Sequence, residues 1–316
     1  MNDSEQERSS DEAGPVAQRK KPRRQKTAVS VLAVTYFTLF SVSWSNAQSF
    51  TQGLTFSLQV GSLVANDQHA QFYNGQESSP NNIYRILHSP LYGEQIWQDL
   101  TTEGLITDAV SNYRLLQIEE YGRMYYRMSL HAGVGLRYDY PSGWGWMAQF
   151  GHARLHANGA FLLSRDNNTG LPGEDRYVSC AILGQERRIN IDAGLRRTFA
   201  LRPNFEFGFE VGGRLVNTQV EQNDIIICGN SYNILDLWNG RTPDYTTPEY
   251  DYVNQGGIGY GAFLTLEASY TMPAVSAITV GYTLSFEQIN LPGFETPLPQ
   301  HLIFVRFDIY DFFLNL

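Results

Sequence analysis

The segment Tyr125–Tyr140, YYRMSLHAGVGLRYDY, decides the fold because its residue types alternate with a period of two. Apolar and aromatic side chains share one face: Tyr126, Met128, Leu130, Ala132, Val134, Leu136, Tyr138 and Tyr140. The intervening positions, from Tyr125 and Arg127 to Asp139, are mostly polar or small. The segment exceeds the roughly 5–6 residues of an ordinary strand, but it suits a tilted membrane-crossing strand of about 9–11 residues with extensions. A two-faced transmembrane strand is predicted.

Seven further segments repeat this alternation, some clearly and some weakly. The clear ones are residues 205–215, 258–272, 278–286 and 303–310, and the weaker ones are residues 54–64, 144–163 and 188–201. Together with residues 125–140 they predict eight strands.

The predicted connections alternate in length along the chain. Tight turns are expected at Pro141–Gly143, Arg202–Asn204 and Pro273–Ser276. Between them come nearly sixty residues after the first strand, then loops at about 165–187, 229–257 and 290–299. Transmembrane barrels have short periplasmic turns and longer outer loops, whereas a soluble sandwich gives no reason for every second connection to be tight. The prediction is an all-β, antiparallel up-and-down barrel of about eight strands with both ends periplasmic.

The first long connection is predicted to contain one or two short helices over the barrel mouth. Residues 81–100 place apolar side chains at helical spacing, interrupted by Ser89-Pro90. Tyr84 and Trp97 in this stretch are candidates for contacting an unknown protein or surface ligand. The alternative is a lid in which the same residues pack on their own barrel.

The N-terminal region has the organisation of a secretory signal. A basic cluster from Arg19 to Lys26 precedes the apolar stretch Ala28–Trp44, and the small-residue site Ser45-Asn46-Ala47 follows. This order predicts a signal peptide over residues 1–47, with a long basic n-region, and a barrel domain over residues 48–316. An uncleaved anchor is the alternative, and the long n-region leaves open a true start later in the chain.

Charge excludes one class of partner. Residues 1–47 hold seven Lys and Arg and five Asp and Glu, so residues 48–316 keep 16 basic and 27 acidic residues and a net charge of −11. Every lysine lies before residue 27. Nucleic-acid binding requires a basic footprint, so this class is excluded.

The leader, the alternating strands, the tight Pro-containing turns and the aromatic-rich final run FVRFDIYDFFLNL resemble small Gram-negative outer-membrane barrels of the OmpA/OmpX type. The resemblance covers about residues 50–316 and is architectural, since no motif identifies a subfamily. It implies a location in the outer membrane, with outer-membrane lipid and the barrel-assembly machinery as partners. Such barrels usually end in Phe, whereas this chain ends in Leu316.

In such a barrel the polar face of each strand lines the interior. This rule assigns the following charges to the interior: Arg127, Arg137, Asp139, Asp192, Arg196, Glu206, Glu210, Arg214, Glu267, Glu287, Arg306 and Asp308. Eight strands enclose a space that side chains fill, and buried charges must be paired, so an ion-paired interior is predicted. An open, porin-like pore is the alternative, because many inward positions are glycine. Arg197 departs from the pattern, since it falls on the apolar face.

Cys180 and Cys228 are both expected on the outer side of the barrel. An exported chain favours a disulfide between them, with two buried free thiols as the alternative. Their spacing matches no zinc site, and no metal or cofactor is predicted.

Catalytic motifs are absent from the sequence: it has no Gly-x-Ser-x-Gly, His-Glu-x-x-His or phosphate loop. Ser129 and His131 share a strand face, but such neighbours lie about 6–7 Å apart, too far for a nucleophile–base hydrogen bond. The sequence therefore favours a non-enzymatic barrel whose outer loops serve binding, adhesion or envelope structure. A narrow porin-like channel for small solutes and a lipid-modifying enzyme are the alternatives.

Overall fold

A computed structural model describes residues 53–76, 81–89, 92–106, 113–165, 177–235, 255–272 and 276–310. The predicted signal peptide, over residues 1–47, lies outside these ranges. None of the helices in the described part of the chain is long and apolar enough to cross a membrane.

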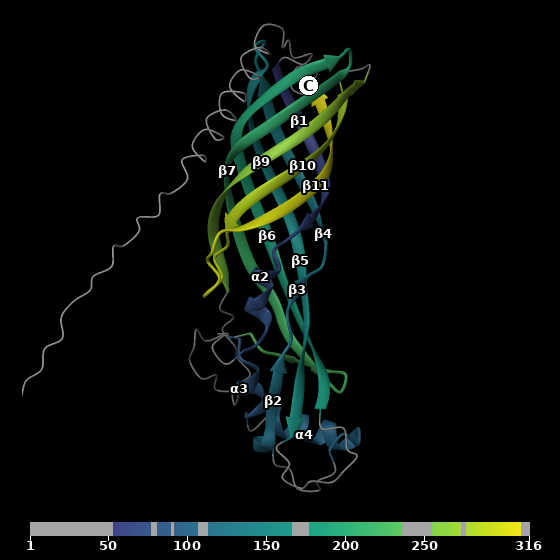
Figure 1. The fold of residues 1–316 in the computed structure, drawn as a ribbon, viewed down its shortest axis with the longest axis vertical. Coiled ribbons are helices and arrows are strands. Elements are labelled where there is room, and N and C mark those ends of the chain that lie inside the picture. Colours follow the sequence, from purple (N-terminus) through teal and green to yellow (C-terminus); the bar gives the residue numbers. More distant parts are fainter. Residues whose placement is uncertain are drawn as a thin grey trace, which may run out of the picture. The chain divides into compact units, whose positions relative to one another are not determined.

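Eight long strands form a closed antiparallel ring (Figure 1). They are β1 (Gly53–Val64), β4 (Ser129–Asp139), β5 (Trp144–Arg165), β6 (Tyr177–Arg202), β7 (Phe205–Ile227), β9 (Gly256–Met272), β10 (Ser276–Gln288) and β11 (Leu298–Tyr310). β1 pairs with β11 on one side and with β4 on the other, and the pairing of β5 with β6 completes the ring. The predicted fold class, an antiparallel barrel of about eight strands, is confirmed.

Shorter elements belong to the connections between these strands. They are α2 (Asp67–Ala70), η2 (Gln71–Tyr73), α3 (Ile83–Leu87), α4 (Tyr92–Thr102), η3 (Tyr113–Leu115), β2 (Leu116–Tyr121), β3 (Tyr125–Tyr126) and β8 (Asn230–Asn233). The helices expected in residues 81–100 are α3 and most of α4. They separate at the predicted break, where the Ser89 hydroxyl accepts a hydrogen bond from the Tyr92 amide at 2.9 Å.

The exterior of the ring carries an apolar belt that ends within β5 and β7. On β5 the outward residues Trp146 and Phe150 are apolar and exposed, but the next outward residues, His152 and Arg154, are polar. β7 changes in the same way, from the exposed Leu215 to Asn217. An apolar outer band above a polar interior is the arrangement that lipid requires of a barrel.

Two tight turns at the other end of the ring contain residues with positive φ, the conformation for which Gly and Asn are favoured in turns. Gly143 has a φ of 77° and donates its amide hydrogen bond to the Tyr140 carbonyl at 2.9 Å. Asn204, with a φ of 69°, closes the turn between β6 and β7, a backbone region that Gly and Asn adopt most readily. Beside the first turn, Tyr138 and Trp146 stack with ring centroids 6.1 Å apart, which places aromatic rings at the edge of the belt nearest the turns.

The long loop predicted over about residues 165–187 is wrong for its second half, because β6 already begins at Tyr177. Beyond the belt, β5, β6 and β7 continue together; β2 and β3 pair with β5, and β8 pairs with β7 (Figure 1). In this part of β5 the apolar Leu155 and Phe161 are buried and Arg154 and His156 are exposed, and on β6 Ile182 is buried whereas Gln185 is not. The apolar-outside pattern that identified the membrane strands is therefore reversed here.

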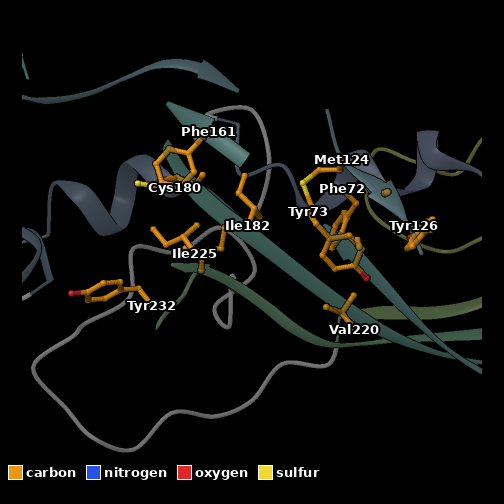
Figure 2. Close-up of a cluster of buried hydrophobic side chains, with 14 of the residues drawn as sticks. Phe72, Tyr73, Met124, Tyr126, Phe161, Cys180, Ile182, Val220, Ile225 and Tyr232 are labelled. Atoms are coloured by element: carbon orange, nitrogen blue, oxygen red, sulfur yellow. The ribbon is translucent and has the colours of Figure 1, made fainter. Parts of the chain in front are cut away.

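The reversed faces enclose an apolar core, in contrast to the charged interior of the barrel (Figure 2). Most of its buried residues come from the first long connection and from β5, β6 and β7, and they include Phe72, Tyr73, Ile83, Trp97, Met124, Phe161, Ile182 and Ile225. We call α2 to β3, β8 and these strand extensions the outer subdomain. It is built like a water-soluble domain on top of a membrane barrel.

Trp97→Ala is expected to loosen the outer subdomain without unfolding the barrel. The indole is 2% exposed, and large-to-small core changes of this kind cost about 3–5 kcal/mol. Amide hydrogen exchange should rise in α3, α4 and β2, while the heat-modifiable gel migration of the folded barrel should persist. Tyr84→Ala, which removes a side chain that is 46% exposed, is the matched control and should change exchange little. Equal exchange in both variants would contradict this.

Candidate functional site

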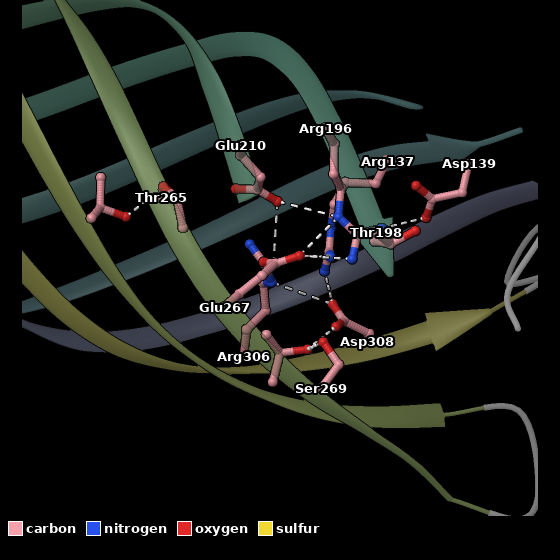
Figure 3. Close-up of polar contacts among 12 residues, drawn as sticks. Arg137, Asp139, Arg196, Thr198, Glu210, Thr265, Glu267, Ser269, Arg306 and Asp308 are labelled. Atoms are coloured by element: carbon pink, nitrogen blue, oxygen red, sulfur yellow. Dashed lines mark hydrogen bonds and ion pairs between the residues drawn. The ribbon is translucent and has the colours of Figure 1, made fainter. Parts of the chain in front are cut away.

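The inside of the barrel is filled by charged side chains, which we call the lumen network (Figure 3). Glu267 of β9 lies at its centre, fully buried, with three arginines around it. Its Oε1 is 2.7 Å from the Arg196 Nη2 and 3.9 Å from the Arg137 Nη1, and its Oε2 accepts from the Arg306 Nη2. One carboxylate thereby connects β4, β6, β9 and β11 across the lumen.

The same arginines bind further carboxylates. Arg196 reaches Asp139 at 2.5 Å, and Arg306 lies 3.3 Å from Glu210. Asp308 accepts hydrogen bonds from Arg137 and, at 2.7 Å, from the Thr279 hydroxyl. Pairing of this kind offsets the desolvation of each charge, which costs several kcal/mol when a charge is buried alone.

A second group of charges lies nearer the outer subdomain. Arg214 binds Asp192 with two parallel hydrogen bonds of 2.6 and 2.7 Å, a bidentate geometry that is stronger than a single contact. The Glu287 carboxylate joins Arg214, at 3.3 Å, to Arg188, at 3.4 Å. Arg188 in turn contacts Glu186 at 2.6 Å, and this contact links the network to the outer subdomain.

Glu186 connects the barrel to the outer subdomain. Its Oε2 accepts hydrogen bonds from the Tyr73 hydroxyl at 2.6 Å and from the Tyr126 hydroxyl at 3.0 Å. Burial, and then the negative charge of Glu186, raises the pKa of both tyrosines well above the usual value, so both remain protonated donors. This contact could not be predicted from the sequence, because Glu186 falls in the predicted loop and Tyr126 on the predicted lipid face.

His69 is a second contact between the outer subdomain and the rim of the barrel. Its Nε2 lies 3.2 Å from the Thr296 carbonyl, and its Nδ1 lies 3.2 Å from the Gln300 amide nitrogen. These partners suit a neutral ring that donates from Nε2 and accepts at Nδ1. Burial, and then the positive charge of Arg188, lowers the pKa of His69 from 6.5 to about 4.

All but one of the charges assigned to the interior are buried: Arg137, Asp139, Asp192, Arg196, Glu206, Glu210, Arg214, Glu267, Glu287, Arg306 and Asp308. Arg127 is the exception, and its assignment is wrong. The strand is interrupted at Arg127 and Met128, which are both exposed between β3 and β4. The alternation shifts at this interruption, so Tyr126 points inward and Arg127 outward.

Arg197, the charge on the predicted apolar face, is 5% exposed at the inner end of β6. Its guanidinium donates to the Ser142 carbonyl and lies 5.2 Å from the centre of the Trp144 ring. A backbone acceptor and an aromatic face therefore replace water around this charge.

The structure does not bring Ser129 and His131 together. The Ser129 hydroxyl donates to the Arg127 carbonyl at 3.1 Å, while the His131 Nε2 lies 3.2 Å from the Asn190 side-chain oxygen. Both side chains therefore belong to the polar lining of the barrel, where the sequence had placed them.

The predicted disulfide is not present, because Cys180 and Cys228 are free thiols. Cys180 points into the outer apolar core, whereas Cys228 leaves β7 with a φ of 50° and lines a shallow pocket with Glu103 and Leu105. Burial and Cys228 raise the pKa of the Cys180 thiol to about 12, and burial with Glu103 and Asp99 raises that of Cys228. Neither thiol is activated as a nucleophile.

The two candidate interaction residues have different environments. Trp97 is buried in the outer core, so it offers no surface to a partner, and its assignment is corrected to a packing role. Tyr84 is exposed on α3 and stacks on His88 with ring centroids 3.7 Å apart. Trp97 therefore follows the alternative interpretation, in which the residue packs within its own protein. Of the two residues, Tyr84 is the one whose exposed side chain can contact a partner.

An eight-stranded closed sheet, apolar outside and ionic inside, has the architecture of a transmembrane β-barrel. No protein-family model matches the chain, and no curated protein does.

Three solved structures with low similarity to this chain are outer-membrane proteins. Neisserial surface protein A is 6% identical, with a TM-score of 0.36, over 82% of this chain and 97% of that one. Outer membrane protein OprG from Pseudomonas aeruginosa is 8% identical, with a TM-score of 0.37, over 84% and 100%. Ail, the attachment invasion locus protein of Yersinia pestis, is 9% identical, with a TM-score of 0.33, over 82% and 100%. At such values the likeness carries no information about activity.

Glu267→Gln is expected to destabilise the barrel by about 3–5 kcal/mol, because it leaves three buried arginines without their shared carboxylate. Urea unfolding of the protein in lipid vesicles, followed by tryptophan fluorescence, measures the change. Glu103→Gln removes an exposed carboxylate outside the barrel and serves as the control, with an expected change below about 0.5 kcal/mol. A loss for Glu267→Gln no larger than that of the control would show that the network does not depend on this charge.

The outer subdomain is expected to open more readily in acid because of His69. The folded state keeps the ring neutral down to about pH 4, whereas the unfolded segment takes up a proton near pH 6.5. Stability is therefore complete above pH 6.5 and decreases toward pH 4, by about 2 kcal/mol at pH 5. Hydrogen exchange of α2 and η2 at pH 7.5 and 5, corrected for intrinsic rates, tests this. His69→Gln should abolish the dependence and His88→Gln should retain it; the opposite result would assign the effect elsewhere.

Proposed function

We propose that the protein is a closed, non-enzymatic outer-membrane barrel that carries the outer subdomain as a binding, adhesion or envelope-structure surface. Glu267 with its three arginines is the observation that supports this most directly. Because these side chains come from four strands and meet inside the barrel, they occupy the space that a conducting path would need. The proposal assigns the barrel a supporting role and places function at its outer end.

The outer subdomain is built as a stable surface. Its own apolar core contains Trp97, Phe161 and Ile182, and Glu186 and His69 attach it to the barrel. On its exterior, Tyr84 and other exposed side chains do not pack into this core, so they are accessible to a partner. A rigid, displayed surface suits binding because little conformational entropy is lost on contact.

We further propose that the tight turns and both termini face the periplasm after cleavage of the signal peptide, and that the outer subdomain faces outward. The even number of strands and the alternation of short and long connections support this orientation. Outer-membrane lipid and the barrel-assembly machinery are the partners that follow from it.

Purified protein in planar bilayers is expected to show no steady conductance, because the lumen network closes the barrel. Arg306→Ala combined with Glu267→Ala removes the central pair together with the contacts of both side chains to Arg137, Arg196 and Glu210, and it should produce measurable current. Steady conductance of the unaltered protein would instead favour the narrow channel. Lipid A that changes when the gene is deleted would favour a lipid-modifying enzyme.

A further inference from the structure

A basic band lies on the outer face of the sheet immediately beyond the apolar belt. It consists of Arg127, His152, Arg154, His156 and Arg187, and each of these residues is at least partly exposed. On β5, His152, Arg154 and His156 follow the apolar Phe150 at successive outward positions. Arg187 follows Ile191 and Ile189 in the same way on β6.

Two arginines of this band face each other directly. Arg154 and Arg187 are cross-strand partners in the β5–β6 register, and like charges in this position are destabilising. Glu221 of β7 lies between them, 3.1 Å from the Arg154 Nε and 3.6 Å from the Arg187 Nε. A single carboxylate balances only one of the two positive charges. The pair therefore keeps an excess positive charge at an exposed site.

The neighbouring surface adds a third cation and apolar contacts. The Arg127 amide donates to the His156 carbonyl at 2.9 Å, so Arg127 lies next to β5. Met128 and Leu130, which follow Arg127 in the chain, are both 71% exposed. His131 pairs with Ala153, so Leu130 and Met128 lie at the level of Arg154 and His156. Cations and exposed apolar side chains therefore lie side by side, and this region is amphipathic.

The position of the band is unexpected for this chain. Residues 48–316 carry a net charge of −11, and the barrel interior takes Arg137, Arg188, Arg196, Arg214 and Arg306. Placing three of the remaining arginines together at the belt edge works against their mutual repulsion. An anionic group at this level would remove that repulsion.

We propose that the basic band binds the phosphate headgroup of a lipid in the surrounding leaflet. The guanidinium groups of Arg154 and Arg187 donate to the phosphate oxygens, since Arg binds phosphate through paired hydrogen bonds. The acyl chains lie against Phe150, Ile189 and Leu130 on the belt. Free phosphate would bind only the guanidinium groups, whereas a lipid would also cover the exposed apolar side chains beside them. The apolar neighbours therefore favour a lipid over free phosphate. The inference rests on the proposed membrane location, but it adds a site that the closed-barrel proposal does not require.

Lipid binding to the full-length barrel in detergent tests the site directly. The probe is lipid A with two phosphates, titrated and read by native mass spectrometry, with dephosphorylated lipid A and inorganic phosphate as comparisons. Arg154→Gln combined with Arg187→Gln should weaken binding of the phosphorylated lipid about tenfold or more and leave the dephosphorylated lipid unchanged. Arg202→Gln is the matched control, because it removes an exposed arginine from the opposite end of β6 and should have no effect.

Glu221→Gln gives a prediction of opposite sign. The carboxylate competes with phosphate for the same two guanidinium groups, so its removal should tighten binding of the phosphorylated lipid and steepen the salt dependence. If the three residues served only to stabilise the strands, this variant would bind the lipid no better than the unaltered protein. Heat-modifiable migration of each variant shows whether it has folded.

Three results would overturn the proposal: equal binding by the double variant, equal binding of dephosphorylated lipid A, or displacement of the lipid by an equimolar amount of inorganic phosphate. The comparison of lipids uses the unaltered protein, so it decides the matter even if the double variant does not fold. Conductance of the barrel would contradict the closed-barrel proposal alone. Failure of lipid binding would leave that proposal intact.

Discussion

Closure of the sheet between β5 and β6 is the constraint on which the rest of the structure depends. In lipid no water satisfies exposed backbone groups, so a sheet can span a membrane only when it has no free edge. Once the ring is closed at eight strands, every inward side chain shares one narrow space. The charged residues of the lumen can therefore be tolerated only by pairing with one another, as Glu267 does with Arg137, Arg196 and Arg306.

The change of solvent along the strands accounts for the outer subdomain. Within the belt, apolar side chains point to the lipid and polar ones to the lumen. Beyond the belt the strands are surrounded by water. The side chains of Ile182 and Phe161 are therefore buried in the apolar core, and that of Gln185 lies on the outer face of the sheet. β5, β6 and β7 thus take part in two cores of opposite polarity without any change in strand direction. Glu186 lies where the two cores meet, which is why it binds both Arg188 of the network and the tyrosines of the outer subdomain.

Much of the barrel could be predicted from alternation because the faces of a strand are a local property. Glu267, Arg196 and Arg306 could be assigned to the interior in this way. The same reasoning gave wrong predictions where the apolar face of a strand changes from the outside to the inside, or where the alternation shifts by one residue. Alternation predicts a loop at residues 177–187 because their apolar residues do not match the membrane pattern. It predicts an inward Arg127 because the interruption between β3 and β4 has no sequence signal of its own. The disulfide was predicted from compartment and topology, neither of which reveals that Cys228 leaves its strand in a left-handed conformation.

The outer subdomain was only partly visible in the sequence. The break between α3 and α4 could be read from Ser89-Pro90, but the burial of Trp97 depends on the extensions of β5 to β7, which were not predicted. An aromatic residue at helical spacing can serve a core or a surface equally well. Only the strands packed against it decide between the two.

By itself, the sequence determined which residues of each membrane strand face lipid or lumen, and which connections are tight. These properties follow from the order of residues within a single segment. The tertiary structure decided which charges pair, which aromatic residues are buried and which arginines meet at the belt edge. Such contacts join strands that are far apart in the chain, and their register is set only when the ring closes.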